Sequence, residues 1–492
     1  MSPVVLFSFI IGYFLLLMIV AFVTARGANN ESFFIGNRNS SWILVAFGMI
    51  GTTLSGVTFV SVPGTVGQQS FLYLQIVLGN WLGFILIAYI LLPLYYRLKL
   101  TSIYSYLQVR LGTHSYKTGA SFFLLSRTLG ATARLYLVVR ILHDGILQNF
   151  GLPFWATTVI ILIMILIYTF EGGVKTIVYT DTLQTSFILI GLVVTIGYLL
   201  NSLDYSFSEG LQALNDNGYT RIFDISATSG TFFMKQILAG AFITITMVGM
   251  DQEMMQKNIS VKTLPDSQKN MLTFSFIFLL GNLLSLFLGG LLYLFAAQHD
   301  IAVVGDQLFP LVALKYLPAG LSIVFIIALI SALFPSADGA ITALTSSTCI
   351  DIIGINRRTD WDEVKRLRVR KAVHLTFALV FFVFVMIFRW TDNPSMITLI
   401  LKVAGYTYGP LLGLFSFGVF THRKVHDKYV VWVAIFSPLL CFLLDYYQRD
   451  IFQSYQIGLE LLFYNGLITF LGLLLISKKN DGEVSVFTAN PA

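Results

Sequence analysis

The sequence predicts an all-α polytopic membrane protein, and three features of the chain carry that prediction. Of its 492 residues, 56% are hydrophobic and only 11% are charged, whereas soluble domains contain roughly 25% charged residues. Apolar runs that approach the roughly twenty residues needed to cross a bilayer recur along the whole chain. The sequence also lacks the short alternating strands that are typical of a membrane β-barrel.

Thirteen apolar runs can be marked, each with ends that shift by several residues. They lie at about 3–25, 42–66, 71–97, 119–149, 153–170, 176–200, 232–256, 270–297, 319–349, 371–390, 394–421, 427–447 and 455–477. The longest polar connections, at about 201–231, 298–318 and 351–370, are too short for a soluble domain. We therefore expect a single membrane domain over residues 1–492.

The basic residues predict the orientation of these spans, because short cytoplasmic loops collect Lys and Arg. Roughly 22 of the 31 Lys and Arg residues fall in the loops after spans 1, 3, 5, 7, 9 and 11 and in the C-terminal tail. This pattern places the N-terminus outside and the C-terminus in the cytoplasm, in the plasma (inner) membrane. The first run is expected to be retained rather than cleaved, since its first positive charge, Arg26, follows it.

Several classes of protein do not fit these features. The pI near 9.1 follows from the topology, so we expect no nucleic-acid partner. The chain has no HExxH motif, its six His residues are scattered, and its two cysteines, Cys349 and Cys441, lie in separate spans, so neither an enzyme nor a zinc site is expected. A receptor usually carries an output domain, but only about a dozen residues follow Lys479.

The stretch ALFPSADGAITALTSST at 332–348 is the most informative part of the chain. It combines hydroxyl side chains, Pro335 and the acid Asp338 inside an otherwise apolar helix. A dehydrated small cation needs hydroxyl oxygens and backbone carbonyls freed by an interrupted helix. The stretch therefore predicts cation transport through an interrupted helix.

Two other spans carry glycines and hydroxyls where a membrane helix should be unbroken. They are GTTLSGVTFVSVPG at 51–64 and LAGAFITITMVGMDQ at 238–252. Inverted repeats of five helices place such broken first helices at the substrate site and favour alternating access over a continuous pore. We expect an extra helix and loop at 1–41, repeats at 42–200 and 232–421, and two final helices with a short tail at 422–492.

Five motifs in order resemble the sodium/solute symporter family. They are SGVTFVSVPG (55–64), YRLKLTSIYSYLQVRLG (96–112), EGGVKTIVYTDTLQ (171–184), GMDQEMMQK (249–257) and GYTYGPLLGLFSFGVF (405–420). The resemblance covers nearly the whole chain and implies a leucine-transporter-type core with uptake coupled to sodium. Members carry sugars, proline, pantothenate, iodide, monocarboxylates or sialic acid. Among these members, the chain most resembles the sialic-acid and monocarboxylate transporters.

The resemblance implies a sodium site between the broken first core helix and the eighth. The expected carbonyls are those of Gly51, Leu54 and Ala332, and the family's hydroxyl pair falls on Pro335 and Ser336. Pro335 offers only a carbonyl, which departs from the family. Pro335 also fits a simple helix kink, with Ser336 bonding back to the backbone.

A second cation site occurs in some members, and its acid matches Asp181. Its hydroxyl positions fall on Asp338 and Gly339. Two carboxylates that approach each other need a cation or a proton between them. The alternatives are that Asp338 pairs with Lys402, the basic residue deep in the eleventh span, and that Asp181 serves as a gate or helix cap.

Arg134 is the candidate for holding a substrate carboxylate. SRTLGATARLYLVVR carries Arg127, Arg134 and Arg140, and Arg134 lies too near the middle of its span to reach either interface. Guanidinium groups suit planar carboxylates, and sialic-acid-type members use an arginine of this helix in that way. The alternative is an arginine satisfied by helix-end carbonyls, Glu253 or Asp251.

Further substrate contacts are expected from the broken helices, although half of these hydroxyls fit ordinary interhelical hydrogen bonds. The candidates are Thr53, Ser55, Thr58, Ser61, Gln75, Thr244 and Tyr406, the last as an aromatic gate or a surface for a sugar ring. Asp251 and Gln252 are expected to gate the inner end through a salt bridge with a basic residue of an inner loop.

The sequence thus predicts a sodium-coupled symporter that imports a small organic solute, with an acidic sugar or a monocarboxylate as the anionic candidates. Its partners would be the solute, the sodium ion and the lipid bilayer, with one chain as the functional unit. A proton-coupled transporter, or one of neutral sugars or other solutes with the same fold, is the alternative.

Overall fold

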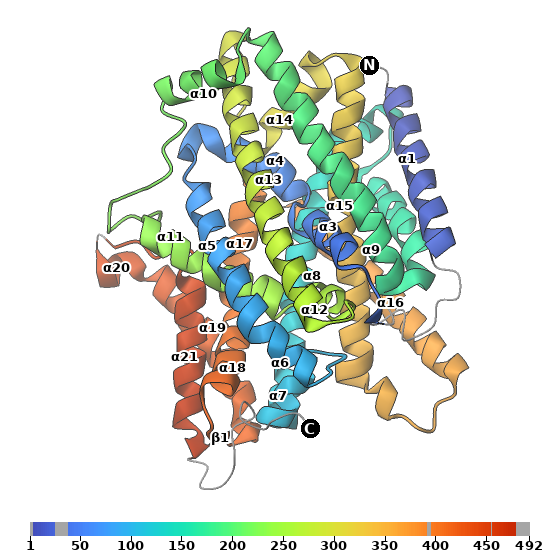
Figure 1. Cartoon of the computed structure of the whole chain (residues 1–492), viewed down its shortest axis with the longest axis vertical. Coiled ribbons are helices and arrows are strands. Elements are labelled where there is room, and N and C mark those ends of the chain that lie inside the picture. Colours follow the sequence, from blue (N-terminus) through green and yellow to red (C-terminus); the bar gives the residue numbers. More distant parts are fainter. Residues whose placement is uncertain (1–2, 25–37, 391–394, 454, 479–492) are drawn as a thin grey trace.

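The computed structural model describes residues 3–24, 38–390, 395–453 and 455–478. Tilted helices run along the long axis of the molecule and enclose shorter, broken ones near its middle (Figure 1). Arg26 and the tail beyond Lys479, which entered the orientation argument, lie outside the described residues.

The helices of the first half of the chain are α1 (Pro3–Thr24), α3 (Trp42–Thr53), α4 (Gly56–Gln69), α5 (Tyr73–Leu86), α6 (Leu92–Arg97), α7 (Ser105–Arg110), α8 (Thr113–Gly145), α9 (Phe154–Ser202) and α10 (Phe207–Asp216). Those of the second half are α11 (Phe233–Thr244), α12 (Gln252–Ile259), α13 (Leu264–Gln298), α14 (Leu308–Leu311), α15 (Ala319–Ser347), α16 (Glu363–Phe388), α17 (Met396–Thr407), α18 (Gly409–Phe420), α19 (Val430–Tyr446), α20 (Gln448–Phe452) and α21 (Leu461–Leu475). Strands β1 (Lys424–Val425) and β2 (Ser477–Lys478) pair antiparallel, with Val425 opposite Ser477.

Both expected helix breaks are present, and a third lies in the eleventh span. The axis turns by 56° between α3 and α4, by 66° between Phe233–Gly249 and α12, and by 49° between α17 and α18. At the first break the backbone of Ser55 is extended, and Gly56 then restarts the helix. The second break follows a π-helical turn, Ile245–Gly249, and Asp251 caps the new helix by accepting from the N–H groups of Glu253 and Met254. Local backbone chemistry therefore accounts for the first two breaks.

Eight described helices are long and apolar enough to cross a membrane, or up to 11 if each bent pair counts as one span. Phe154–Ile167 and Leu461–Leu475 are shorter apolar helices, so the count of thirteen spans stays a prediction. The fifth and sixth expected spans belong to one continuous helix, α9.

The expected interruption of the span at 319–349 is wrong, because α15 continues through Pro335 as far as Ser347. Pro335 removes a backbone donor from the helix interior without ending the helix. The irregularity comes later, as a π-helical turn at Thr348–Ile353.

The first helix break packs against α9 and α15. The helix α3 packs on α9, while α15 packs on α9, α8 and α3. A Cβ added at Gly51 would lie 2.8 Å from the Thr185 hydroxyl oxygen and 3.3 Å from the Asp181 carbonyl oxygen. Only glycine permits this approach, which sets the break beside α9 and α15.

Candidate functional site

A cavity of about 100 Å³ lies against the first break. Its walls come from the α3–α4 break, α5, α8, the π-helical turn after α11, α13 and α17. It is lined by four hydroxyl-bearing residues, Thr52, Thr53, Ser55 and Thr58, and by two arginines, Arg127 and Arg134. A concave space with a few polar groups among apolar walls is typical of a small-molecule site.

The structure brings most of the predicted substrate contacts together. Arg134, Thr53, Ser55, Thr58 and Thr244 all line this central cavity. Asn80 of α5 and Tyr73 also line it, together with apolar side chains such as Phe84 and Phe278. Residues from both expected repeats therefore meet in one place.

Three predicted contacts, Gln75, Ser61 and Tyr406, do not line this cavity. The buried Gln75 amide donates to the carbonyls of Leu72 and Thr231, at 3.1 and 3.3 Å, and ties α5 to the loop before α11. Ser61 is fully buried in α4 and does not line the cavity. Gln75 therefore supports the scaffold, and Ser61 is buried within it.

Arg127 and Arg134 lie one heptad apart on α8 and differ in their ion-pair partners. Arg127 is 3% exposed and forms ion pairs with Glu253 and with Asp251, the latter at 3.7 Å. Arg134 makes no hydrogen bond or ion pair with any residue that the structure describes. The alternative in which Glu253 or Asp251 pairs directly with Arg134 is therefore wrong: both acids pair with Arg127 and act on Arg134 only over a longer distance. The Arg134 guanidinium is instead presented to the cavity.

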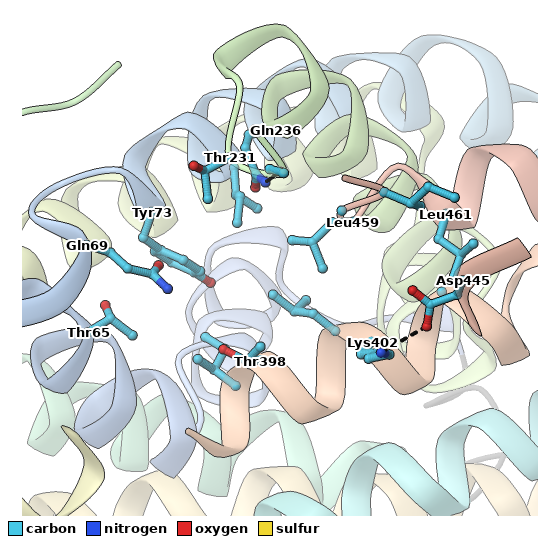
Figure 2. A pocket seen from close by; sticks show the side chains of 17 residues that line it. Thr65, Gln69, Tyr73, Thr231, Gln236, Thr398, Lys402, Asp445, Leu459 and Leu461 are labelled. Atoms are coloured by element: carbon cyan, nitrogen blue, oxygen red, sulfur yellow. Dashed lines mark hydrogen bonds and ion pairs between the residues drawn. The ribbon is translucent and has the colours of Figure 1, made fainter. Parts of the chain in front are cut away.

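A larger cavity of about 270 Å³ lies next to the central one (Figure 2). Its walls include Thr65 and Gln69 of α4, the loop residue Thr231, and Leu459 near the start of α21. Tyr73, Ile397 and Leu401 line both cavities. These three side chains form the partition between the larger cavity and Arg134.

Lys402 does not pair with Asp338, so that prediction is wrong. Its side chain is 57% exposed and its ammonium lies 2.9 Å from an Asp445 carboxylate oxygen in the larger cavity (Figure 2). The Tyr406 hydroxyl donates to the same carboxylate. Tyr406 therefore supports this ion pair and is not among the residues lining the central cavity. The sequence could not reveal that Lys402 lies on a water-accessible wall rather than inside the bundle.

The expected sodium cage lies where α15 faces the α3–α4 break. The Pro335 ring lies 3.4 Å from the position of a Cβ at Gly51, and the Ala332 carbonyl oxygen lies 3.9 Å from that of a Cβ at Gly56. Leu54 sits in the break and its N–H donates to Ile50 at 2.7 Å. The Ser336 hydroxyl is 3.5 Å from the Ala332 carbonyl oxygen, a weak back-bond that leaves its lone pairs available. The expected ligands thus lie on facing elements, and the sodium site stays a prediction.

Lys257 is the main residue that the sequence reasoning missed. It follows directly after the seventh apolar run, 232–256, which predicts a place in an inner loop, yet it is 2% exposed within α12. Its ammonium donates to the Asp181 carboxylate at 2.7 Å and to the Thr52 hydroxyl at 2.5 Å. Glu253, four residues earlier, lies 3.4 Å away. The Glu253–Lys257 spacing was the available signal, since such a pair shares one helix face.

Asp181 and Asp338 are both fully buried near this ammonium. Asp338 accepts a hydrogen bond from the Gly339 N–H at 2.5 Å and adds a favourable electrostatic interaction with Lys257. The positive charge beside the two acids in this structure thus belongs to the chain itself.

The gating pair behaves differently from the expectation. Asp251 pairs with Arg127, which belongs to a span and not to an inner loop, so the expected loop partner is wrong. Gln252 accepts from the Ile103 N–H at 2.9 Å and donates to the Thr101 carbonyl at 3.0 Å. Gln252 therefore fastens α12 to the connection between α6 and α7.

Broken helices that surround a small polar cavity within a bundle of spans define a membrane transporter. The family profile described as "Sodium:solute symporter family" matches residues 33–428. The chain belongs to the sodium:solute symporter family. It is accordingly a transporter rather than an enzyme, and sodium is the co-transported ion of its family.

Individual relatives agree with this placement. The chain is 21% identical over 451 residues to the Sodium/sialic acid symporter SiaT of Proteus mirabilis, covering 87% of each chain. It is 26% identical to the Sodium/iodide cotransporter of Homo sapiens, covering 80% of this chain and 62% of the relative. It is also 26% identical to Sodium-coupled monocarboxylate transporter 1 of Xenopus laevis, covering 81% of this chain and 64% of the relative.

A solved structure shares the fold. It is titled as the substrate-bound outward-open state of a Na⁺-coupled sialic acid symporter, with a TM-score of 0.82 and 17% identity over 96% of this chain and 97% of the other. The expected leucine-transporter-type helical architecture is therefore confirmed.

Proposed function

We propose that this transporter takes up a small carboxylate together with sodium, with Arg134 as the group that holds the carboxylate. The observation that carries the proposal is the guanidinium of Arg134, which faces the cavity without a partner among the described residues. Removing an ion from water inside a protein costs several kcal/mol when nothing compensates for it. A bound carboxylate would supply that compensation through two parallel hydrogen bonds.

The size of the cavity favours a short monocarboxylate over an acidic sugar. An engineered cavity of roughly 150 Å³ accommodates benzene, and the space beside Arg134 is about 100 Å³. A carboxylate of a few carbons fits such a space, whereas a sugar acid requires the Tyr73, Ile397 and Leu401 partition to move. The relatives include a sialic acid symporter and a monocarboxylate transporter, both of which carry anions.

Sodium is assigned to the cage formed by the carbonyls of Gly51, Leu54 and Ala332 with the Ser336 hydroxyl. The cage adjoins Thr52 and Thr53, which line the substrate cavity. An ion that holds the break in one conformation would also preform the hydroxyl wall of the cavity. The coupling then equals the difference in sodium affinity between the two states of the transporter.

The test is uptake into proteoliposomes under an inward sodium gradient at constant pH. The panel contains short monocarboxylates, an acidic sugar, a neutral sugar and an amino acid. We expect sodium-dependent uptake of a monocarboxylate that Arg134→Gln abolishes, while Arg140→Gln, whose side chain is 32% exposed and pairs with Asp144, keeps it. Uptake driven by a proton gradient without sodium would favour the proton-coupled alternative, and an equal loss of neutral and acidic substrates would assign Arg134 a structural role.

We also infer that the larger cavity faces the outside of the cell. Its walls include the ends of the 203–231 and 447–460 connections, which the distribution of basic residues places outside. Both native cysteines are buried, so single cysteines introduced at the exposed Asn217 and Asp360 can be labelled separately. A membrane-impermeant maleimide should react in intact cells with Asn217→Cys and not with Asp360→Cys, and the reverse pattern would overturn the orientation.

A further inference from the structure

The position of Lys257 follows from the second helix break. The chain turns by 66° after Gly249, and every residue of α12 is buried. That turn carries Lys257 out of the expected inner loop and into the middle of the bundle. Its ammonium there contacts three elements at once: α3 through Thr52, α9 through Asp181 and its own helix through Glu253.

The ammonium occupies the side of Asp181 where a second coupling cation was expected. It lies 2.7 Å from one carboxylate oxygen of Asp181. The other carboxylate oxygen has no hydrogen-bond partner among the described residues. A single remaining oxygen is a poor cation site, because bound metal cations take several oxygen ligands.

The hydroxyl ligands of such a site are also replaced. Of the two hydroxyl positions on α15, one is the acid Asp338 and the other is Gly339. A Cβ at Gly339 would clash with the Glu253 carboxylate, so Glu253 fills the space that a hydroxyl side chain would need. Where a cation site would have hydroxyls and an ion, this chain has carboxylates and an ammonium.

The charges around Lys257 keep its ammonium in place. Glu253 lies between the two bases, with one oxygen toward Lys257 and the other paired with Arg127. Arg127 also pairs with Asp251, and Asp338 adds to the favourable field at Lys257. Four acids thus surround two bases in a region excluded from water, so the loss of either positive charge would leave buried carboxylates uncompensated.

We propose that Lys257 is a tethered cation that takes the place of the second coupling ion at Asp181. This inference rests on the proposed cation-coupled function. It assigns sodium to the cage at the α3–α4 break alone and predicts one sodium ion fewer per cycle than a transporter in which sodium binds the equivalent acid. Because the ammonium also holds Thr52, it links the acid site to the break beside Gly51.

The decisive variant is Lys257→Met, which keeps the length of the side chain and removes the charge. It leaves the carboxylates of Asp181 and Glu253 without their cation, and an external ion is then expected to bind there. We expect the Hill coefficient for sodium in uptake to rise from about one toward two. We also expect the thermal stability of the purified variant to depend more strongly on sodium than that of the parent protein. Lys262→Met, at an exposed position after α12, is the matched control and should change neither measurement.

A paired variant separates the tethered cation from a general packing defect. Asp181→Asn combined with Lys257→Met removes both charges, so the additional sodium dependence of the single variant should disappear. Asp181→Asn alone should leave the sodium-induced stabilisation at the parent level, because Asp181 does not bind sodium in this scheme. The single Asp181 variant decides the matter even if Lys257→Met cannot be purified.

Two results would overturn the proposal. One is loss of sodium-induced stabilisation in Asp181→Asn, which would make Asp181 a sodium ligand. The other is a Lys257→Met protein whose sodium response equals that of the parent in both measurements. If the parent protein transported its substrate without any need for sodium, the proposed function would be refuted. The tethered cation would still be tested by measuring how sodium changes the thermal stability of the Lys257→Met protein.

Discussion

Arg127 and Arg134 lie on nearly the same face of α8, one heptad apart, and both line the central cavity, yet only Arg127 forms ion pairs. Arg127 reaches toward α12, where Asp251 and Glu253 meet it in a buried ion-pair cluster. Arg134 lines the cavity beside the α3–α4 break, and no Asp or Glu is among the residues that line this cavity. A charge that the chain has already neutralised stabilises the fold, whereas a charge left without a partner is available to a ligand. The contrast separates a structural arginine from a binding arginine.

The largest effect is expected from Arg127→Gln. Breaking a buried ion pair by removing one partner costs about 3–5 kcal/mol, and here two acids lose their base. We expect a marked fall in the unfolding temperature of the purified protein, measured by a thermal-shift assay in detergent. Arg140→Gln should change stability by less than about 1 kcal/mol, because its pair with Asp144 is solvent-exposed. If Arg127→Gln were as stable as Arg140→Gln, Arg127 would not be a structural arginine and the contrast with Arg134 would fail.

Substitution of Arg134 by lysine tests the other side of the comparison. An ammonium keeps the positive charge but loses the planar pair of donors that fits a carboxylate. We expect roughly a tenfold fall in kcat/KM for carboxylate uptake, equivalent to about 1.4 kcal/mol, with little change in the unfolding temperature. A stability loss as large as that of Arg127→Gln would contradict the assignment.

A smaller effect is expected at the sodium cage. Ser336→Ala removes one oxygen ligand, and a hydrogen bond of this kind contributes about 1 kcal/mol. The sodium concentration for half-maximal uptake should rise by roughly fivefold, a change that a sodium titration of transport measures. Ser346→Ala is the control, since its hydroxyl bonds back to the Thr342 carbonyl at 2.9 Å within the same helix. If Ser336→Ala left the sodium dependence unchanged, the placement of the cage would be wrong.

The smallest effect concerns the pair in the larger cavity. Lys402→Gln breaks the contact with Asp445 (Figure 2), but the lysine side chain is more than half exposed, so water replaces the lost partner. We expect a stability change below about 1 kcal/mol in the same thermal-shift assay. A loss comparable to that of Arg127→Gln would show that this pair holds the two helices together.

Much of the site could be predicted because its chemistry is local. Two helix breaks can be predicted from neighbouring residues alone. One lies among the glycines and hydroxyl residues around Gly51, and the other lies just before Asp251. Arg134 was recognisable because its position within a long apolar run forbids it to reach an interface. Five cavity-lining side chains were found in this way.

The residues whose positions differ from the sequence prediction depend on tertiary packing. The sequence predicts that Lys402 is buried and that Lys257 lies in a loop, whereas Lys402 is exposed and Lys257 is buried. Hydropathy indicates depth along the membrane, but it does not indicate which face of a helix packs against protein. Pro335 is expected from the sequence to interrupt α15, yet the helix continues through it as far as Ser347. Tyr406 turned from substrate contact to the partner of Asp445 because α19 supplies an acid from a remote part of the chain.

By itself, the sequence determined that this chain is a helical membrane transporter with broken helices, because spans and breaks depend on runs of neighbouring residues. Only the tertiary structure decided which charges neutralise each other. Asp181 and Lys257 are separated by more than seventy positions, and the ion pair between them exists because the bend before α12 turns the lysine toward α9. Inside a bilayer the energy of a charge depends on its nearest partner in space, and that partner is set by packing rather than by order along the chain.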